Sequence, residues 1–176
     1  MSVLVDTNVL LRLAQPNHRQ YPAAIDGVVR ARLAGETLYV TPQNNAEFWA
    51  AATRPVGAAN GLGLTATAAA GEIATIERLF QLAADDPAIH PIWKGLVITH
   101  RVLGTQVYDA RLVAAMLAHG IDRILTFNVA DFSRYGVNRA ASRSGAVSTV
   151  PADWDYGAKS SGCSTIGAPC AVRAAA

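Results

Sequence analysis

The sequence has few cysteines, few charged residues and no long uninterrupted hydrophobic run. The two cysteines, Cys163 and Cys170, both lie near the C-terminus, whereas a disulfide framework needs cysteines spread through the fold. No segment approaches the ~18 consecutive apolar residues of a membrane-spanning helix, and the first five residues lack the basic region of a signal peptide. We therefore expect a soluble protein of the reducing cytoplasm, with no membrane association.

Charge also limits the classes of partner that the sequence indicates. Charged residues make up 16% of the chain and the net charge is +2, so no charge run indicates binding to nucleic acid or acidic lipid. Only Lys94 and Lys159 are lysines, and the other basic residues are arginines. Arginine suits bidentate contacts with phosphate, but an arginine- and alanine-rich chain is also explained by genomic base composition, which we favour.

Length and composition predict one folded domain followed by a tail. A chain of 176 residues with 51% hydrophobic content can bury a single core. From about Asp153 onward glycine, serine and alanine dominate and no periodicity remains. We predict a folded domain over residues 1–152 and a flexible, low-complexity tail over residues 153–176.

Short β-prone runs alternate with segments of helical periodicity, which is typical of a parallel sheet with helical crossovers. The predicted strands are residues 3–5, 37–41 and 123–127, with an edge strand at 147–151. The predicted helices are residues 9–14, 21–33, 43–53, 65–82, 92–103 and 107–119. Asn44 or Asn45 is the expected cap of the third helix, and residues 89–91 are expected to form a loop or a brief extended segment. The predicted fold is an α/β/α sandwich.

Four acidic residues follow strands or begin helices at corresponding places. They are Asp6, Glu47, Asp109 and Asp131. In an open α/β sheet such positions meet beyond the carboxyl ends of the strands, where ligands bind. Each acid also has a purely structural explanation: Asp6 is a good helix cap, and Glu47 suits the positive end of a helix dipole. The Asp85-Asp86-Pro87 turn is best explained as a solvated helix stop.

The combination of four acids predicts a cation. Two carboxylates ~5 Å apart repel by ~3 kcal/mol at an effective dielectric constant of about 20, so a fold that groups four of them needs a counter-charge. Ligands that are all oxygen favour Mg²⁺ or Mn²⁺. Gly61-Leu62-Gly63 lacks the lysine and the helix of a phosphate-binding loop, and no nucleophile elbow is present. The residues thus indicate a metal-dependent phosphodiesterase or nuclease.

At these positions the sequence resembles the PIN domain family, and within it the VapC-like ribonuclease toxins of prokaryotic toxin–antitoxin systems. The resemblance covers about residues 1–150, and it is carried by Val5-Asp6-Thr7-Asn8, Asn45-Ala46-Glu47-Phe48, Tyr108-Asp109-Ala110 and Leu125-Thr126-Phe127-Asn128-Val129-Ala130-Asp131-Phe132. It implies a PIN-like sandwich, a Mg²⁺ site and hydrolysis of RNA. Asp6, Glu47 and Asp109 match the three defining acids. The fourth varies in the family between the positions of Asn128 and Asp131, and we favour Asp131.

The resemblance implies roles and partners for other residues as well. Thr7, Asn8 and Asn128 would support the metal-binding acids, and Arg12 and Arg111 are candidates for contact with phosphate. The family also implies a VapB-like antitoxin that blocks the site, and often a homodimer. Two alternatives stay open: a PIN-type nuclease of RNA processing without an antitoxin, and a catalytically inert module that binds RNA or protein.

Overall fold

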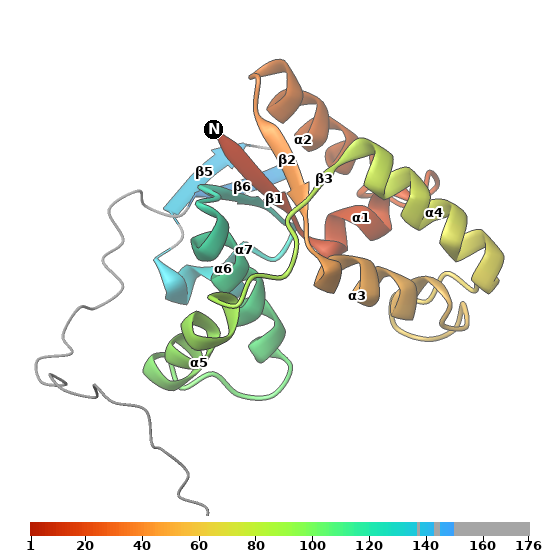
Figure 1. Cartoon of the computed structure of the whole chain (residues 1–176). Helices are drawn as coiled ribbons and strands as arrows, with labels where there is room; N and C mark the ends of the chain where they lie inside the picture. Colours follow the sequence, from red (N-terminus) through yellow and green to blue (C-terminus); the bar gives the residue numbers. More distant parts are fainter. Residues whose placement is uncertain (137, 143–144, 150–176) are drawn as a thin grey trace, which may run out of the picture.

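A computed structural model describes residues 1–136, 138–142 and 145–149. Its sheet has the strand order β3-β2-β1-β4-β6-β5, and Figure 1 shows the sheet in the middle of the molecule. The strands are β1 (Ser2–Val5), β2 (Thr37–Val40), β3 (Gln81–Leu82), β4 (Arg123–Leu125), β5 (Asn138–Ser142) and β6 (Gly145–Thr149). The first four are parallel to one another, and β6 pairs antiparallel with β4.

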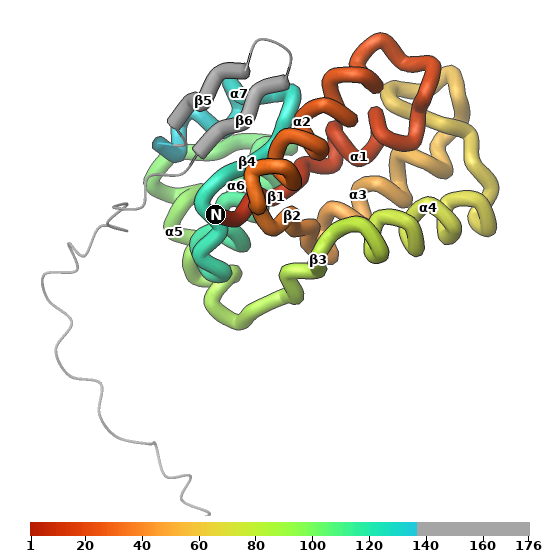
Figure 2. The backbone as a smooth tube through the Cα atoms, turned by 90° about the horizontal axis from the view of Figure 1, so that it is seen from above, coloured from red at the N-terminus to blue at the C-terminus, as the bar shows by residue number. Residues whose placement is uncertain are grey.

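Helices cover both faces of this sheet, as predicted. They are α1 (Thr7–Leu13), α2 (Tyr21–Leu33), α3 (Pro42–Ala52), α4 (Ala66–Leu79), α5 (Ile89–Thr99), α6 (Gln106–His119) and α7 (Val129–Phe132), followed by a 3-10 turn, η1 (Ser133–Tyr135). In Figure 2, α1 to α4 lie on one side of the sheet and α5 to α7 on the other.

The central strand β1 divides the core into two halves. Val3 and Val5 pack with α1, α2, α3 and α4, whereas Leu4, between them, packs with α5 and α6 on the opposite face. All three side chains are fully buried. A strand that is buried on both faces reads as a continuous apolar run, and this one ends directly at Asp6. The fold therefore fixes the position of that acid firmly.

Several predicted element boundaries are wrong. Residues 89–91 do not form a loop, because α5 already begins at Ile89. The predicted helix over residues 65–82 ends at Leu79, and Gln81–Leu82 pair with β2 as the short edge strand β3. The cap of α3 is Thr41 rather than Asn44 or Asn45. The Thr41 hydroxyl accepts from the Asn44 backbone N–H, and the Thr41 backbone N–H donates to Asn44 Oδ1. The capping box was missed because asparagine replaces the usual acid or glutamine.

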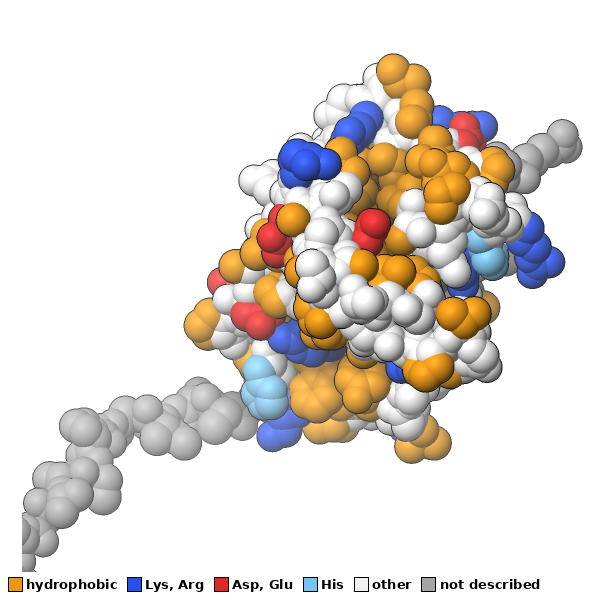
Figure 3. Space-filling model, turned by 90° about the vertical axis from the view of Figure 1, so that its right-hand side faces the viewer, with side chains coloured by type: hydrophobic (Ala, Val, Ile, Leu, Met, Phe, Trp, Pro, Cys, Tyr) orange, Lys and Arg blue, Asp and Glu red, His pale blue; other side chains and the backbone are white. Residues whose placement is uncertain are grey.

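The apolar residues of α2 recur at helical spacing, which predicts one buried stripe, but the structure buries this stripe only in part. Val28 is buried, but Ile25 and Val29 are 39% and 46% exposed, as is 43% of Leu79 on α4. These side chains line a groove of about 280 Å³ between α2 and α4. Figure 3 shows hydrophobic side chains gathered in a hollow on this side of the molecule. We call this feature the α2–α4 groove.

None of the helices in the described part of the chain is long and apolar enough to cross a membrane. The predicted edge strand at residues 147–151 overlaps β6, which ends at Thr149. The predicted tail over residues 153–176 lies outside the described residues, so the domain boundary at residue 152 stays a prediction.

Candidate active site

Asp6 leaves β1 at the carboxyl edge of the sheet and occupies the cap position of α1. Its side chain makes no capping hydrogen bond. Instead one carboxylate oxygen, Oδ2, accepts from the Thr126 hydroxyl at 2.6 Å and from Asn8 Nδ2 at 2.8 Å. Only 8% of the residue is exposed. The side chains of Thr126 and Asn8 thus hold this carboxylate at the edge of the sheet.

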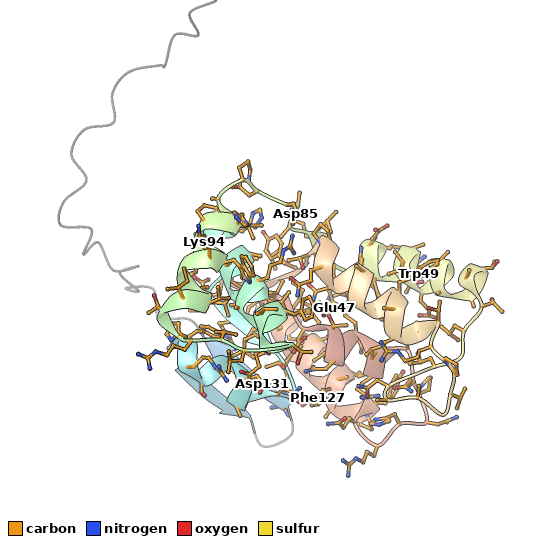
Figure 4. All side chains as sticks on the ribbon, turned by 90° about the horizontal axis from the view of Figure 1, so that it is seen from below. Glu47, Trp49, Asp85, Lys94, Phe127 and Asp131 are labelled. Carbon is orange, nitrogen blue, oxygen red and sulfur yellow. The ribbon has the colours of Figure 1, made fainter. Side chains whose placement is uncertain are left out.

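Glu47 reaches the same edge from α3. Thr7 donates its hydroxyl hydrogen to Glu47 Oε2 at 2.6 Å, and Gln43 Nε2 donates to Oε1 at 2.7 Å. Asn44 Nδ2 in turn donates to the Thr7 hydroxyl at 3.1 Å. In Figure 4, Glu47 points inward between the two halves of the molecule, whereas its neighbour Trp49 lies away from this region. Helix α3 therefore supplies the acid and one of its donors, Gln43, and the first residue of α1, Thr7, supplies the other.

The two remaining acids come from α6 and α7. Asp109 lies in the first turn of α6 and Asp131 in the first turn of α7. Burial, followed by the charges of the other three acids, raises the pKa of Asp109 to about 7, although the charge of Arg134 lowers it. We call these four residues the acid cluster: Asp6, Glu47, Asp109 and Asp131. The structure thus brings together all four acids selected from the sequence.

Burial and repulsion also act on Asp6. Burial and the charge of Glu47 raise its pKa to about 6, although hydrogen bonds from Thr126 and from the backbone of Asn8 and Thr7 lower it. The pKa values of two carboxyls of one site are thus raised, first because burial disfavours the charged form and second because neighbouring carboxylates repel it. A site of this kind is electrostatically suited to a cation.

The donor atoms fit a hard metal ion, although the side chains do not converge on one point. Among the described residues no group of three or more His, Cys, Asp or Glu side chains stands in position to hold a metal. Asp6 and Glu47 are turned toward neutral donors, as expected of carboxylates that repel one another. All the candidate ligands are oxygens, which is the set that Mg²⁺ and Mn²⁺ prefer.

Three residues of this site were not selected from the sequence. Thr126 is buried at the end of β4 and bonds Asp6, Gln43 bonds Glu47, and the charge of Arg134 acts on Asp109. Thr126 and Gln43 lie at the end of a strand and the start of a helix, as the acids do. Uncharged side chains at such places are common, so they do not indicate a site from the sequence. Arg134 lies within the 3-10 turn η1, which is too short for sequence periodicity to predict the side on which a residue lies.

Asn8 and Asn128 lie beside Asp6, whereas the hydroxyl of Thr7 bonds Glu47. Asn8 bonds both Asp6 and the Thr126 hydroxyl, and the backbone N–H of Asn128 donates to the same hydroxyl at 3.0 Å. Arg111 bonds Asp85 and Gln43. Arg12 bonds Gln15, and also Asn60 at 2.8 Å in the loop that follows α3. The roles of both arginines in phosphate binding stay predictions.

The raised pKa of Asp6 predicts that metal-free protein is more stable once this charge is removed. Below pH 3.8 the carboxyl is protonated in both the folded and the unfolded chain, so it carries no penalty. The penalty grows from about pH 4 to pH 6 and reaches at most about 3 kcal/mol above it. Asp6→Asn should therefore raise the free energy of unfolding at pH 8 by about 1–3 kcal/mol, and much less at pH 4. Urea denaturation without metal checks this, and an equal effect at both pH values contradicts it.

Thr126 should control metal affinity through Asp6. Thr126→Val keeps the shape of the side chain but removes the hydroxyl that bonds Asp6, Asn8 and the Asn128 backbone, so Mg²⁺ affinity should fall by about 10- to 100-fold. Thr126→Ser keeps the hydroxyl and is the matched control. Calorimetric titration with Mg²⁺ measures the difference. Equal Mg²⁺ affinities of the two variants would show that the Thr126 hydroxyl does not control metal affinity.

The fold and the acid cluster define a class of protein: an α/β/α domain with an acidic site at the carboxyl edge of a parallel sheet. The model of the PIN domain family matches residues 3–138. The chain belongs to the PIN domain family. No curated protein matches the sequence.

Solved structures with the same fold include VapC proteins and VapBC complexes. The chain is similar to VapC20 of Mycobacterium tuberculosis, described as a toxin that cleaves the sarcin–ricin loop, with 20% identity and a TM-score of 0.55 over 76% of this chain and 95% of that one. VapBC2 of Rickettsia felis, bound to a promoter DNA fragment, has 10% identity and a TM-score of 0.58 over 76% of this chain and 92% of that one. VapBC-1 of nontypeable Haemophilus influenzae has 15% identity and a TM-score of 0.54 over 77% of this chain and 92% of that one.

Proposed function

We propose that this protein is a Mg²⁺-dependent endoribonuclease and the toxin of a toxin–antitoxin pair. The observation that carries the proposal is the acid cluster, in which carboxylates from four separate segments lie close enough to raise the pKa of Asp109. Membership of the PIN family and the similarity to VapC20, a toxin that cleaves RNA, support the same conclusion. Mn²⁺ is the alternative ion.

Asp6, Glu47, Asp109 and Asp131 would hold the metal, directly or through water. When bound, Mg²⁺ would lower the pKa of a water molecule, align the scissile phosphate and offset the charge on the leaving oxygen. Thr126 and Asn8 fix the Asp6 carboxylate, and Thr7 and Gln43 fix that of Glu47, so that these two acids are oriented before substrate arrives. Arg134, whose charge acts on Asp109, would contact a phosphate oxygen of the substrate.

The α2–α4 groove is the surface on which we place a VapB-like antitoxin. It exposes Ile25, Val29 and Leu79, and its lining is mostly apolar. An exposed apolar patch rimmed by polar residues is typical of a protein interface, and an amphipathic helix is the usual occupant of such a groove. Two of the similar structures are VapBC complexes. A homodimer is a further expectation from the family.

The ribonuclease proposal is tested by offering single-stranded RNA and DNA of one sequence to the purified protein in Mg²⁺. We expect cleavage of RNA alone. Induced expression in bacteria tests the toxin role, and should arrest growth for the wild-type chain but not for Asp109→Asn. RNA cleavage without growth arrest would favour an RNA-processing nuclease that has no antitoxin.

A further inference from the structure

A pocket of about 390 Å³ opens beside the acid cluster, between the β3–α5 connection and the start of α6. It is lined by Asp85, Asp86, Ile89, His90, Trp93 and Arg111. This volume lies in the range of small-molecule sites. The catalytic proposal uses none of these side chains except Arg111, so the pocket needs an explanation of its own.

One wall of the pocket is aromatic and held in place. The rings of His90 and Trp93, one turn apart on α5, lie 5.6 Å from centre to centre with an angle of 35° between their planes. The indole N–H of Trp93 donates to the Val107 carbonyl at 3.0 Å, which fixes the orientation of the ring. Such a wall can stack a flat ligand without first being ordered.

The opposite side of the pocket carries two carboxylates. Asp85 Oδ1 accepts from Arg111 at 2.7 Å, and Asp86 Oδ1 accepts from the Ala88 backbone N–H at 2.7 Å. These two bonds engage one oxygen of each carboxylate, and both residues are exposed, so that a ligand can reach the second oxygens. Because ionised carboxylates only accept hydrogen bonds, they select a ligand whose edge carries adjacent N–H donors.

A hydrogen-bonded series joins this pocket to the acid cluster. Arg111 donates to Asp85 and, at 3.1 Å, to Gln43 Oε1, and Gln43 donates to Glu47 at 2.7 Å. Asp85 and Glu47, its two ends, are labelled in Figure 4. A ligand in the pocket therefore sits next to the proposed cleavage centre, separated from it by two side chains.

We propose that this pocket binds a guanine base of the RNA substrate, next to the phosphate that is cleaved. The base would stack on Trp93, and its N1–H and N2–H₂ groups would donate to the carboxylates of Asp85 and Asp86. Recognition of unstacked bases by aromatic stacking and edge hydrogen bonds is the common mode for single-stranded RNA. This inference rests on the proposed ribonuclease function and adds a base preference to it.

Binding of free mononucleotides tests the pocket without requiring cleavage. Equilibrium dialysis of the full-length Asp6→Asn protein against GMP, IMP and UMP should give binding in the millimolar range for GMP. IMP, which lacks the N2 amino group, should bind about 10-fold more weakly. Trp93→Ala should weaken GMP binding by about 10-fold or more, and Trp93→Phe, which keeps a stacking ring, should retain most of it.

Asp85→Asn with Asp86→Asn should abolish the difference between GMP and IMP. NMR locates the ligand, because GMP should shift the Trp93 indole resonance, identified by its loss in Trp93→Phe, and leave Trp49 unmoved. Equal binding of all three nucleotides, or no binding, overturns the proposal. A shift caused by arginine amide but not by GMP also overturns it, and would assign the pocket to a side chain of a protein partner. GMP binding by a protein that cleaves no RNA would refute the proposed function alone.

Discussion

Asp109→Asn is expected to reduce RNA cleavage by about 10³-fold or more and to leave the fold intact. Burial, followed by the charges of the other three acids of the cluster, raises the pKa of Asp109 to about 7. Asparagine has nearly the same shape but no charge to hold a cation. Loss of metal stabilisation is worth several kcal/mol in the transition state, and each 1.36 kcal/mol is a factor of ten in rate. Single-turnover cleavage measures the loss.

Asp26→Asn is the matched control, because Asp26 lies on α2 and pairs with Arg30 away from the acid cluster. It should cleave RNA at the wild-type rate. Circular dichroism and thermal melting should show both variants folded. An Asp109→Asn protein that cleaves within about 10-fold of wild type would exclude Asp109 from the metal site.

Placing charge in the α2–α4 groove is expected to release the enzyme from its antitoxin. The double variant Ile25→Asp, Val29→Asp introduces two carboxylates on a surface that we expect a partner to bury. Binding should weaken by at least about 30-fold, because each hot-spot residue contributes 2 kcal/mol or more. The measurement is titration with a purified VapB-like antitoxin that inhibits the wild-type protein, with RNA cleavage followed in the same samples.

Leu33→Asp is the control for this prediction. Leu33 is also an apolar residue on α2, but it is 84% exposed and does not line the groove. It should leave inhibition unchanged. Persistent inhibition of the double variant would move the antitoxin to another surface.

The sequence predicted the parts of the fold that depend on strong local patterns. The sequence located four elements within about two residues, namely β1, β2, β4 and α6. Their apolar runs end at residues that commonly terminate a strand or a helix, such as Asp6 or Gly120. Gly120 has a φ of 61°, a left-handed conformation that glycine adopts readily. The short strand β3 could not be predicted, because its pairing with β2 is a tertiary contact and both of its residues are exposed.

The acids of the candidate site were predictable because charge at a strand end is conspicuous. What the sequence could not supply is the set of neutral donors. Thr126 lies 120 positions from Asp6, and Gln43 lies 65 positions from Tyr108, whose carbonyl it contacts. Contacts between residues so distant in the chain depend on the completed sheet. The exposure of Ile25 and Val29 was missed for a related reason, since periodicity does not distinguish a core from an interface.

The central claim is that metal held by the acid cluster cleaves RNA, and the most direct test is a gel assay of purified protein on total RNA and a tRNA panel. Wild-type protein in Mg²⁺, wild-type protein in EDTA, and Asp6→Ala in Mg²⁺ are run in parallel. We predict discrete cleavage products in the first sample only. Cleavage that persists in EDTA, or in Asp6→Ala, would contradict the account.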